Sequence, residues 1–320
     1  MGLHRMPVQV TWVCVILSEM AAAAIPFPFP LALPNCPDRC GDVEIPYPFG
    51  LTDGCYLKET GDFYINCSNL AGKAQPMTGN VFVKEISIQG QIDILMYKAF
   101  DCYNNSATGL KNNFYATATL RVPIFTVSNT QNKFVAIGCD TYAYLRGYKN
   151  DEPFSIGCLS VCQNISNVPN GTCSGIGCCQ MEIPQGLKNI TLEASSYKNH
   201  TNVSSFNPCS FAFIIRQDQF NFSSSYLSSL QNNKTLPMVL DWAIGTETCE
   251  DARKNKSAYR CGGNSTCHNS INGSGYRCNC TNGYRGNPYL KDGCQGIQFY
   301  FHISTTIFQG KKKKKKTISK

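Results

Sequence analysis

The stretch CEDARKNKSAYRCGGNSTCHNSINGSGYRCNCTNGYRGNPYLKDGC, residues 249–294, holds six cysteines separated by 11, 5, 10, 1 and 13 residues. A segment this short cannot bury enough apolar surface to fold by hydrophobic burial alone. Disulfides stabilise such segments by restricting the unfolded chain, each by about 2–4 kcal/mol. We therefore expect every cysteine of the stretch to be disulfide-bonded: Cys249, Cys261, Cys267, Cys278, Cys280 and Cys294.

This spacing, with a Cys-Asn-Cys step before the last long gap, is typical of an EGF-like module over residues 248–295. Gly283–Cys294 is rich in the turn-forming residues that a small hairpin needs. Zinc is the alternative for clustered cysteines, but the stretch lacks paired Cys-x2-Cys clamps. The residues before Cys249 also lack the acidic run that would supply calcium ligands. The sequence therefore predicts no metal and no cofactor.

The EGF-like module places the whole chain in an oxidising compartment, because disulfides persist only there. Of nineteen cysteines, twelve lie between Cys36 and Cys209 and six in the EGF-like stretch, which leaves only Cys14 in the N-terminal apolar segment. These even numbers predict two separately stapled units, of which residues 36–247 form the larger. The neighbours Cys178 and Cys179 are expected to bond to different partners, and the pairing of the twelve cysteines stays open.

The formal net charge of +8 does not indicate a nucleic-acid partner. Residues 36–247 carry 14 basic and 17 acidic side chains, and residues 248–295 carry 7 and 3. Most of the excess comes from residues 296–320, which hold seven lysines and no acid. Because the larger unit is slightly acidic, no bulk-charge argument for nucleic-acid binding holds.

Asn-x-Ser/Thr sequons occur thirteen times in the sequence. Chance gives about four for this composition, and the motif marks surface loops of secreted proteins, so the excess favours a glycosylated chain of the secretory pathway. Asn66 and Asn279 each precede a cysteine, whose disulfide would compete with glycosylation. The predicted glycosylation sites are the other eleven: Asn104, Asn164, Asn170, Asn189, Asn199, Asn202, Asn221, Asn233, Asn255, Asn264 and Asn272.

Both ends of the chain are expected to lie outside the folded units. Residues 1–24 have the basic start, apolar run and small residues of a signal peptide, and residues 25–35 form a proline-rich leader. Residues 296–320 are expected to be a disordered tail, and the simplest interpretation is a truncated product ending in non-coding sequence. The alternative is membrane insertion, because a lysine run behind an apolar stretch imitates a stop-transfer signal.

The first unit has the alternating patterns of β-strands and little helical periodicity. Val81–Ile88 and Ile92–Tyr97 predict the clearest hairpin. The fold class is therefore mostly β and disulfide-rich, a cysteine-rich β domain followed by a small EGF-like module. Further strands are expected at Phe63–Cys67, Ala116–Phe125, Phe134–Cys139, Ser210–Arg216 and Val239–Ile244.

Five separated blocks carry a resemblance to a known family. They are CGDVEIPYPFG from Cys40, AIGCDTYA from Ala136, GIGCCQMEIP from Gly175, NPCSFAFI from Asn207 and VLDWAIG from Val239. In order and spacing these blocks resemble the galacturonan-binding domain of plant wall-associated receptor kinases. The EGF-like module follows where that family has one, so the resemblance covers residues 36–295.

The resemblance implies a pectin-binding ectodomain, which relatives join through EGF modules and one membrane helix to a cytoplasmic kinase. This chain departs from that plan after Cys294, where relatives continue into a calcium-binding EGF repeat. It contains no glycine-rich loop, strand lysine or His-Arg-Asp catalytic loop. We therefore expect a truncated ectodomain without kinase activity, secreted or retained in the cell wall. It would meet the plasma membrane only through partners or a full-length form.

Other catalytic chemistry has little support in the sequence. The mature chain has three histidines, His200, His268 and His302, and none is placed for a Ser-His-Asp or Cys-His arrangement. A glycosidase needs two suitably separated carboxylates, and no pair stands out. We expect no enzyme activity.

Binding an acidic polysaccharide requires basic groups for its carboxylates and flat aromatic faces for its sugar rings. Tyr144–Lys149 is the only short run of the first unit that combines both. The alternative for this run is an exposed loop with ordinary solvated charges. The predicted ligand-binding residues are Tyr144, Arg146, Tyr148 and Lys149, with Arg121 and Lys133 if they lie on the same face.

The leading hypothesis is thus an extracellular ectodomain that binds pectin or galacturonan without a kinase of its own. The alternative is a structural or protein-interaction glycoprotein of the cell wall, whose EGF-like module contacts other receptor ectodomains. A secreted hydrolase is a remote third hypothesis.

Overall fold

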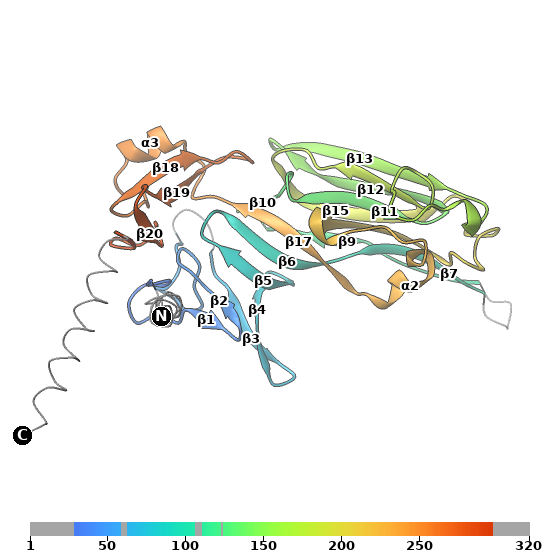
Figure 1. Cartoon of the computed structure of the whole chain (residues 1–320), viewed down its shortest axis with the longest axis horizontal. Helices are drawn as coiled ribbons and strands as arrows, with labels where there is room; N and C mark the ends of the chain where they lie inside the picture. Colours follow the sequence, from blue (N-terminus) through green and yellow to red (C-terminus); the bar gives the residue numbers. More distant parts are fainter. Residues whose placement is uncertain (1–28, 59–62, 106–110, 123, 297–320) are drawn as a thin grey trace, which may run out of the picture.

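The computed structural model describes residues 29–58, 63–105, 111–122 and 124–296. The predicted signal peptide and all of the predicted tail except residue 296 lie outside the described residues. Strands are the predominant regular element of the described chain, and its helices are short, which confirms the mostly β, disulfide-rich fold class. Figure 1 shows an elongated molecule, with the EGF-like residues at one end and long paired strands at the other.

One sheet has six strands in the order β10-β17-β6-β5-β4-β3. The predicted hairpin is confirmed, because β5 and β6 pair antiparallel and the alternate residues Ile92, Ile94 and Met96 are buried. Strands β1 (Arg39–Cys40) and β2 (Val43–Glu44) form a separate small pair. The bounds in the large sheet are β10 (Phe125–Val127), β17 (Thr235–Trp242), β6 (Gln91–Tyr97), β5 (Val81–Ser87), β4 (Lys73–Thr78) and β3 (Asn66–Leu70).

Two further sheets build the other end of the molecule (Figure 1). The five-stranded sheet has the order β14-β11-β16-β7-β8, and the four-stranded sheet has the order β13-β12-β15-β9. The first comprises β14 (Cys178–Glu182), β11 (Asn132–Ile137), β16 (Cys209–Arg216), β7 (Ala99–Asn105) and β8 (Lys111–Ala116). The second comprises β13 (Glu152–Val161), β12 (Asp140–Lys149), β15 (Leu187–Ser196) and β9 (Ala118–Leu120).

Strand β16 is buried on both faces, which explains its nearly continuous apolar sequence. Its residues Ala212 and Ile214 join the main core, whereas Phe211 and Phe213 belong to a second core on the opposite face. That second core is closed by Leu227 and Leu230, from the short helices α2 (Tyr226–Ser229) and η3 (Leu230–Asn232). The serine- and asparagine-rich stretch before β17 therefore covers a sheet face.

The expected strand Ala116–Phe125 is wrong as a single element. The chain leaves β8 at Ala116, enters β9 at Ala118 and β10 at Phe125, and these strands belong to three different sheets. Local alternation continues across the first joint and hides that change of sheet, whereas Pro123 marks the second one in the sequence. The expected strand Phe63–Cys67 is also shifted, since β3 begins at Asn66 and Tyr64 forms only an isolated bridge with Gly50.

All eighteen cysteines from Cys36 to Cys294 are paired, and no disulfide joins the two cysteine groups. Cys178 and Cys179 do bond to different partners, Cys173 and Cys158. The EGF-like stretch contains the pairs Cys249–Cys267, Cys261–Cys278 and Cys280–Cys294. The first unit contains Cys36–Cys55, Cys40–Cys67, Cys102–Cys209, Cys139–Cys162, Cys158–Cys179 and Cys173–Cys178.

The EGF-like module shares the main core of the first unit. It consists of α3 (Cys249–Lys254), β18 (Ser265–Asn269), β19 (Tyr276–Cys280), β20 (Tyr284–Gly286) and β21 (Cys294–Gly296). The ring of Tyr289 lies 5.3 Å from that of Trp242, the last residue of β17. Ile244 and Tyr276 exchange backbone hydrogen bonds of 2.8 and 3.1 Å. The two cysteine-stapled units are therefore packed together without a free linker between them.

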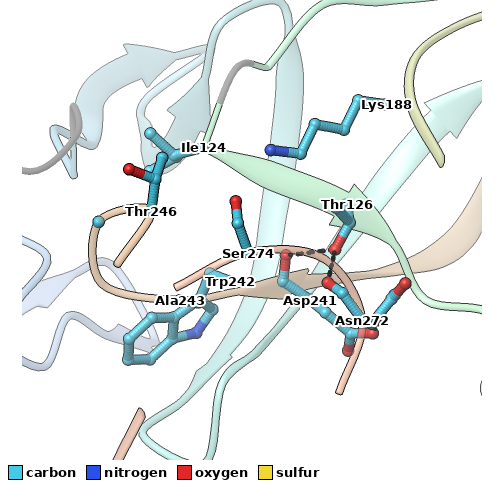
Figure 2. Close-up of a pocket in the computed structure, with 10 residues that line it drawn as sticks. Ile124, Thr126, Lys188, Asp241, Trp242, Ala243, Thr246, Asn272 and Ser274 are labelled. Carbon is cyan, nitrogen blue, oxygen red and sulfur yellow. Dashed lines mark hydrogen bonds between the residues drawn. The ribbon is translucent and has the colours of Figure 1, made fainter. Parts of the chain in front are cut away.

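A buried hydrogen-bond cluster closes this junction (Figure 2). Asn272 Nδ2 donates to Asp241 Oδ2 at 2.6 Å and to Val127 O at 2.9 Å. Its Oδ1 accepts from the Gly186 backbone N–H at 2.7 Å, and Thr126 Oγ1 donates to Asn272 O at 2.9 Å. The Asn272 side chain thus uses both of its N–H groups and its carbonyl to join the module to strands β10 and β17 and to the start of β15.

We expect Asn272→Ala to lower the free energy of unfolding by about 2–4 kcal/mol, because buried partners, one of them a carboxylate, lose their hydrogen bonds. Denaturant unfolding of the purified chain measures this. Asn279→Ala is the matched control, since Asn279 is exposed on β19 and its loss should cost less than about 0.5 kcal/mol. Equal effects of the two substitutions would contradict the role of the cluster.

His200 is fully buried in the turn after β15. Its Nε2 lies 3.4 Å from Ser210 Oγ, and its backbone N–H donates to Asp140 Oδ2 at 3.1 Å. Burial lowers the pKa of His200, and this effect outweighs the opposing influence of the Asp101 and Asp140 carboxylates. In the folded chain this imidazole therefore stays neutral at a pH at which an exposed histidine takes up a proton.

Because the folded-state pKa of His200 lies below its unfolded value, the unfolded chain binds the proton first as the pH falls. We expect stability to drop below pH ~6.5, by at most about 1.4 kcal/mol per pH unit from this group. Unfolding curves between pH 7.5 and 5 should show a shallower dependence for His200→Gln than for the parent. His268→Gln, at an exposed position on β18, is the matched substitution outside the buried turn.

Candidate functional site

The candidate site lies on the outer face of the four-stranded sheet, along strand β12. Residues of β12 alternate, so that Ala143, Leu145 and Gly147 are buried while Tyr144, Arg146 and Tyr148 are exposed. The predicted run is therefore part of a central strand, and the alternative of an exposed loop is wrong. The sheet places its basic and aromatic side chains in one row.

The row continues beyond the predicted residues through aromatic contacts. The guanidinium of Arg146 lies over the Tyr144 ring, 5.3 Å from its centroid. Tyr144 in turn contacts Tyr142 at 6.0 Å, and Tyr142 contacts Tyr197 at 4.7 Å between ring centroids. Opposite Tyr144 stands Gly157 of β13, where a Cβ would come within 3.2 Å of the tyrosine ring. The glycine thus lets the ring lie across the neighbouring strand.

An open groove of about 860 Å³ runs beside this row. Arg121, which follows β9, lines the groove together with Arg146 and Tyr148, so three of the predicted residues meet at one place. Glu193 of β15 also lines it and pairs with Arg146 at 3.2 Å. The Arg146 side chain remains 54% exposed in this pair, so it stays accessible to a second carboxylate from solvent.

The other two predicted basic residues lie elsewhere. Lys149 ends β12 and lines an adjoining hollow of about 830 Å³, which extends to Gly273 and Ser274 of the EGF-like module. Lys133 lies in β11 of the five-stranded sheet and pairs with Glu182 of β14. Lys133 does not line the groove with the two arginines.

Sequence reasoning missed Tyr142, Tyr197 and Glu193. Tyr142 had a readable signal, because it continues the two-residue alternation of Tyr144 and Arg146. Tyr197 and Glu193 come from another strand and its end, and only the pairing of β12 with β15 brings them to this face.

The predicted glycosylation sites differ in exposure. Asn189 is exposed and lines the groove, whereas the Asn272 side chain is buried and both of its N–H groups are hydrogen-bonded. A sugar on Nδ2 would displace these bonds, so the folded arrangement disfavours modification of Asn272, and its occupancy stays a prediction. The side chain of Asn104 is outside the described residues. The exposed sites are Asn164, Asn170, Asn199, Asn202, Asn221, Asn233, Asn255 and Asn264.

Metal chemistry and membrane spanning find no support in the part of the chain that the structure describes. Within residues 29–58, 63–105, 111–122 and 124–296, no group of three or more His, Cys, Asp or Glu side chains is arranged to hold a metal ion. Among the same residues, no helix is long and apolar enough to cross a bilayer.

The fold and the site define a disulfide-rich β domain packed against an EGF-like module. Two family models match the chain, "Wall-associated receptor kinase galacturonan-binding" over residues 36–97 and "Wall-associated kinase" over residues 170–251. The chain belongs to the wall-associated receptor kinase family, and what it shares with that family is the ectodomain.

Individual relatives agree with this assignment. Wall-associated receptor kinase 2 of Arabidopsis thaliana is 38% identical over 266 residues, which are 82% of this chain and 34% of that protein. Wall-associated receptor kinase 5 of the same plant is 39% identical over the same shares. Putative wall-associated receptor kinase-like 13 is 27% identical over 82% of this chain and 42% of its own length. The chain thus spans about a third of the first two relatives, and no solved structure matches it.

Proposed function

We propose that this chain is an extracellular, non-catalytic module that binds galacturonan on the outer face of its four-stranded sheet. One observation carries the assignment to this face. The open groove brings the two arginines Arg121 and Arg146 together with the ring of Tyr148, beside the stacked Tyr144.

The chemistry of the groove suits a polymer with a carboxylate on each sugar. A guanidinium matches a carboxylate through two parallel hydrogen bonds, and exposed tyrosine rings cover the apolar faces of sugars. Tyr144 holds the Arg146 guanidinium in place, so less side-chain freedom is lost on binding. A carboxylate of the ligand would take over the position of Glu193 beside Arg146.

Binding at such a patch is expected to be weak for each sugar and stronger for the polymer. The first unit is slightly acidic, so attraction must come from the local arginines. Exposed ion pairs are screened by salt, and repeated carboxylates along one chain allow many equivalent attachments. Both features predict a strong dependence on ionic strength and on ligand length.

A second surface competes for the same role. The family match described as galacturonan-binding covers residues 36–97, which include none of the six predicted ligand residues. Within that range Lys58 lies over the Tyr56 ring, 5.4 Å from its centroid, and the Tyr56 and Tyr64 rings are 5.4 Å apart. Lys58 also pairs with Asp53. This second surface therefore presents one cation beside its tyrosine rings, whereas the groove presents two arginines.

The alternative function is protein interaction through the EGF-like module. Its loop presents Ile271 with 69% of its surface exposed, an apolar side chain next to the buried Asn272. This function requires no polysaccharide, so binding experiments separate it from the first proposal.

We expect Arg121→Ala/Arg146→Ala to weaken retention on de-esterified homogalacturonan by about tenfold or more, because charged hydrogen bonds are lost. Affinity chromatography or electrophoresis at low and high salt measures this. Lys133→Ala is the control, since it removes one positive charge from the neighbouring sheet and should leave retention unchanged.

Glu193→Gln should strengthen retention severalfold, because it frees Arg146 from its carboxylate partner.

Loss of binding in Tyr56→Ala/Lys58→Ala, with none in the arginine variant, would move the site to residues 36–97. Absence of retention at low salt, or equal retention on a neutral glucan, would refute galacturonan binding.

A further inference from the structure

Asn189 occupies an unusual place in the sheet. Arg146 pairs with Thr191 and Tyr148 pairs with Lys188, so Asn189 and Ile190 together stand opposite the single residue Gly147. This extra residue makes a β-bulge, a device that re-aims a side chain. Asn189 has a left-handed backbone with φ +49°, which asparagine tolerates better than most residues.

The bulge requires a glycine on the facing strand. A Cβ at position 147 would come within 2.8 Å of Lys188 O and 2.9 Å of Leu187 Cδ1. Gly147 therefore lets β15 approach closely at the point where Asn189 turns outward. A glycine at 189 would satisfy the backbone equally well, but asparagine with Thr191 two residues on also completes a sequon.

We propose that an N-linked glycan on Asn189 controls access to the arginine groove. This inference rests on the proposed function of that groove. Asn189 is exposed, and it lines both the groove with Arg121 and Arg146 and the adjoining hollow that ends at Gly273 and Ser274. A sugar chain starting here lies in the path that a polymer would follow.

The modification uses a co-reactant of the secretory pathway, a lipid-pyrophosphate-linked oligosaccharide. The anomeric carbon of its first sugar forms a bond to Asn189 Nδ2 while its bond to the pyrophosphate oxygen breaks. The amide loses one proton and the lipid pyrophosphate leaves. No charge is added to the protein, so the glycan acts on binding by covering the arginines and the Tyr148 ring and leaves their charge unchanged.

The other sequons provide the contrast that makes the inference specific. Asn221 is exposed in the loop that carries Phe222, a residue of the second core, on the far side of the five-stranded sheet. A glycan there leaves the groove open. Asn272 is buried in the junction and offers no free N–H. Among the sequon asparagines that the structure describes, Asn189 alone lines the groove.

The test compares the full chain, secreted from a glycosylating host, with Asn189→Gly and with Asn221→Gln. Glycopeptide mass spectrometry reports occupancy, and retention on polygalacturonate reports binding. Asn189→Gly keeps the left-handed backbone and removes the acceptor. We expect this variant to bind polygalacturonate about tenfold more tightly than the parent that carries a glycan on Asn189. This factor corresponds to a glycan that leaves the groove uncovered about a tenth of the time. Asn221→Gln should bind like the parent.

Native trimming of the parent with an endoglycosidase that leaves one sugar gives a second readout, which does not depend on a substitution. Trimming should raise retention of the parent toward that of Asn189→Gly and leave the variant itself unchanged. An unmodified Asn189, or equal retention of parent, trimmed parent and variant, would overturn the glycan's role while leaving galacturonan binding intact. Absence of retention in every form would instead refute the groove as a binding site, and this inference with it.

Discussion

The hydrogen bond from Asn272 to the buried carboxylate of Asp241 is the constraint on which the arrangement of the two units depends. It closes a junction where the Trp242 ring of the last sheet strand packs on Tyr289 of the EGF-like module. Disulfides hold each unit internally and none crosses between them. Apolar packing and this polar cluster therefore fix the relative position that the covalent links leave free.

The groove depends on close packing within the four-stranded sheet. Two glycines allow side chains and strands to approach closely, Gly157 under the Tyr144 ring and Gly147 against β15. The exposed row of β12 then follows from simple alternation along a strand. Only the pairing of β12 with β15 adds Glu193, the residue that both holds Arg146 and competes with a ligand for it.

The sequence predicted the fold class, the separate cysteine groups and the hairpin of β5 and β6, because these follow from spacing and local alternation. It singled out Tyr144, Arg146 and Tyr148 because they stand in one short run of basic and aromatic residues, and strand geometry then puts these alternate residues on one face. The pairing of strands that lie far apart in the chain could not be predicted from the sequence. Lys133 and Arg121 looked equivalent, yet only Arg121 lines the groove. The change of sheet between Ala116 and Ala118 left no local mark, whereas Pro123 was a readable break before β10.

The hollow beyond Asn189 ends on Gly273 and Ser274, which directly follow the anchoring Asn272. The far wall of that hollow is therefore contributed by the EGF-like module, and its position is set by the junction. A polymer lying along β12 would approach residues of the EGF-like module in one direction and the Tyr142 and Tyr197 rings in the other. The junction therefore gives this surface two chemically different ends, which the four-stranded sheet alone would lack.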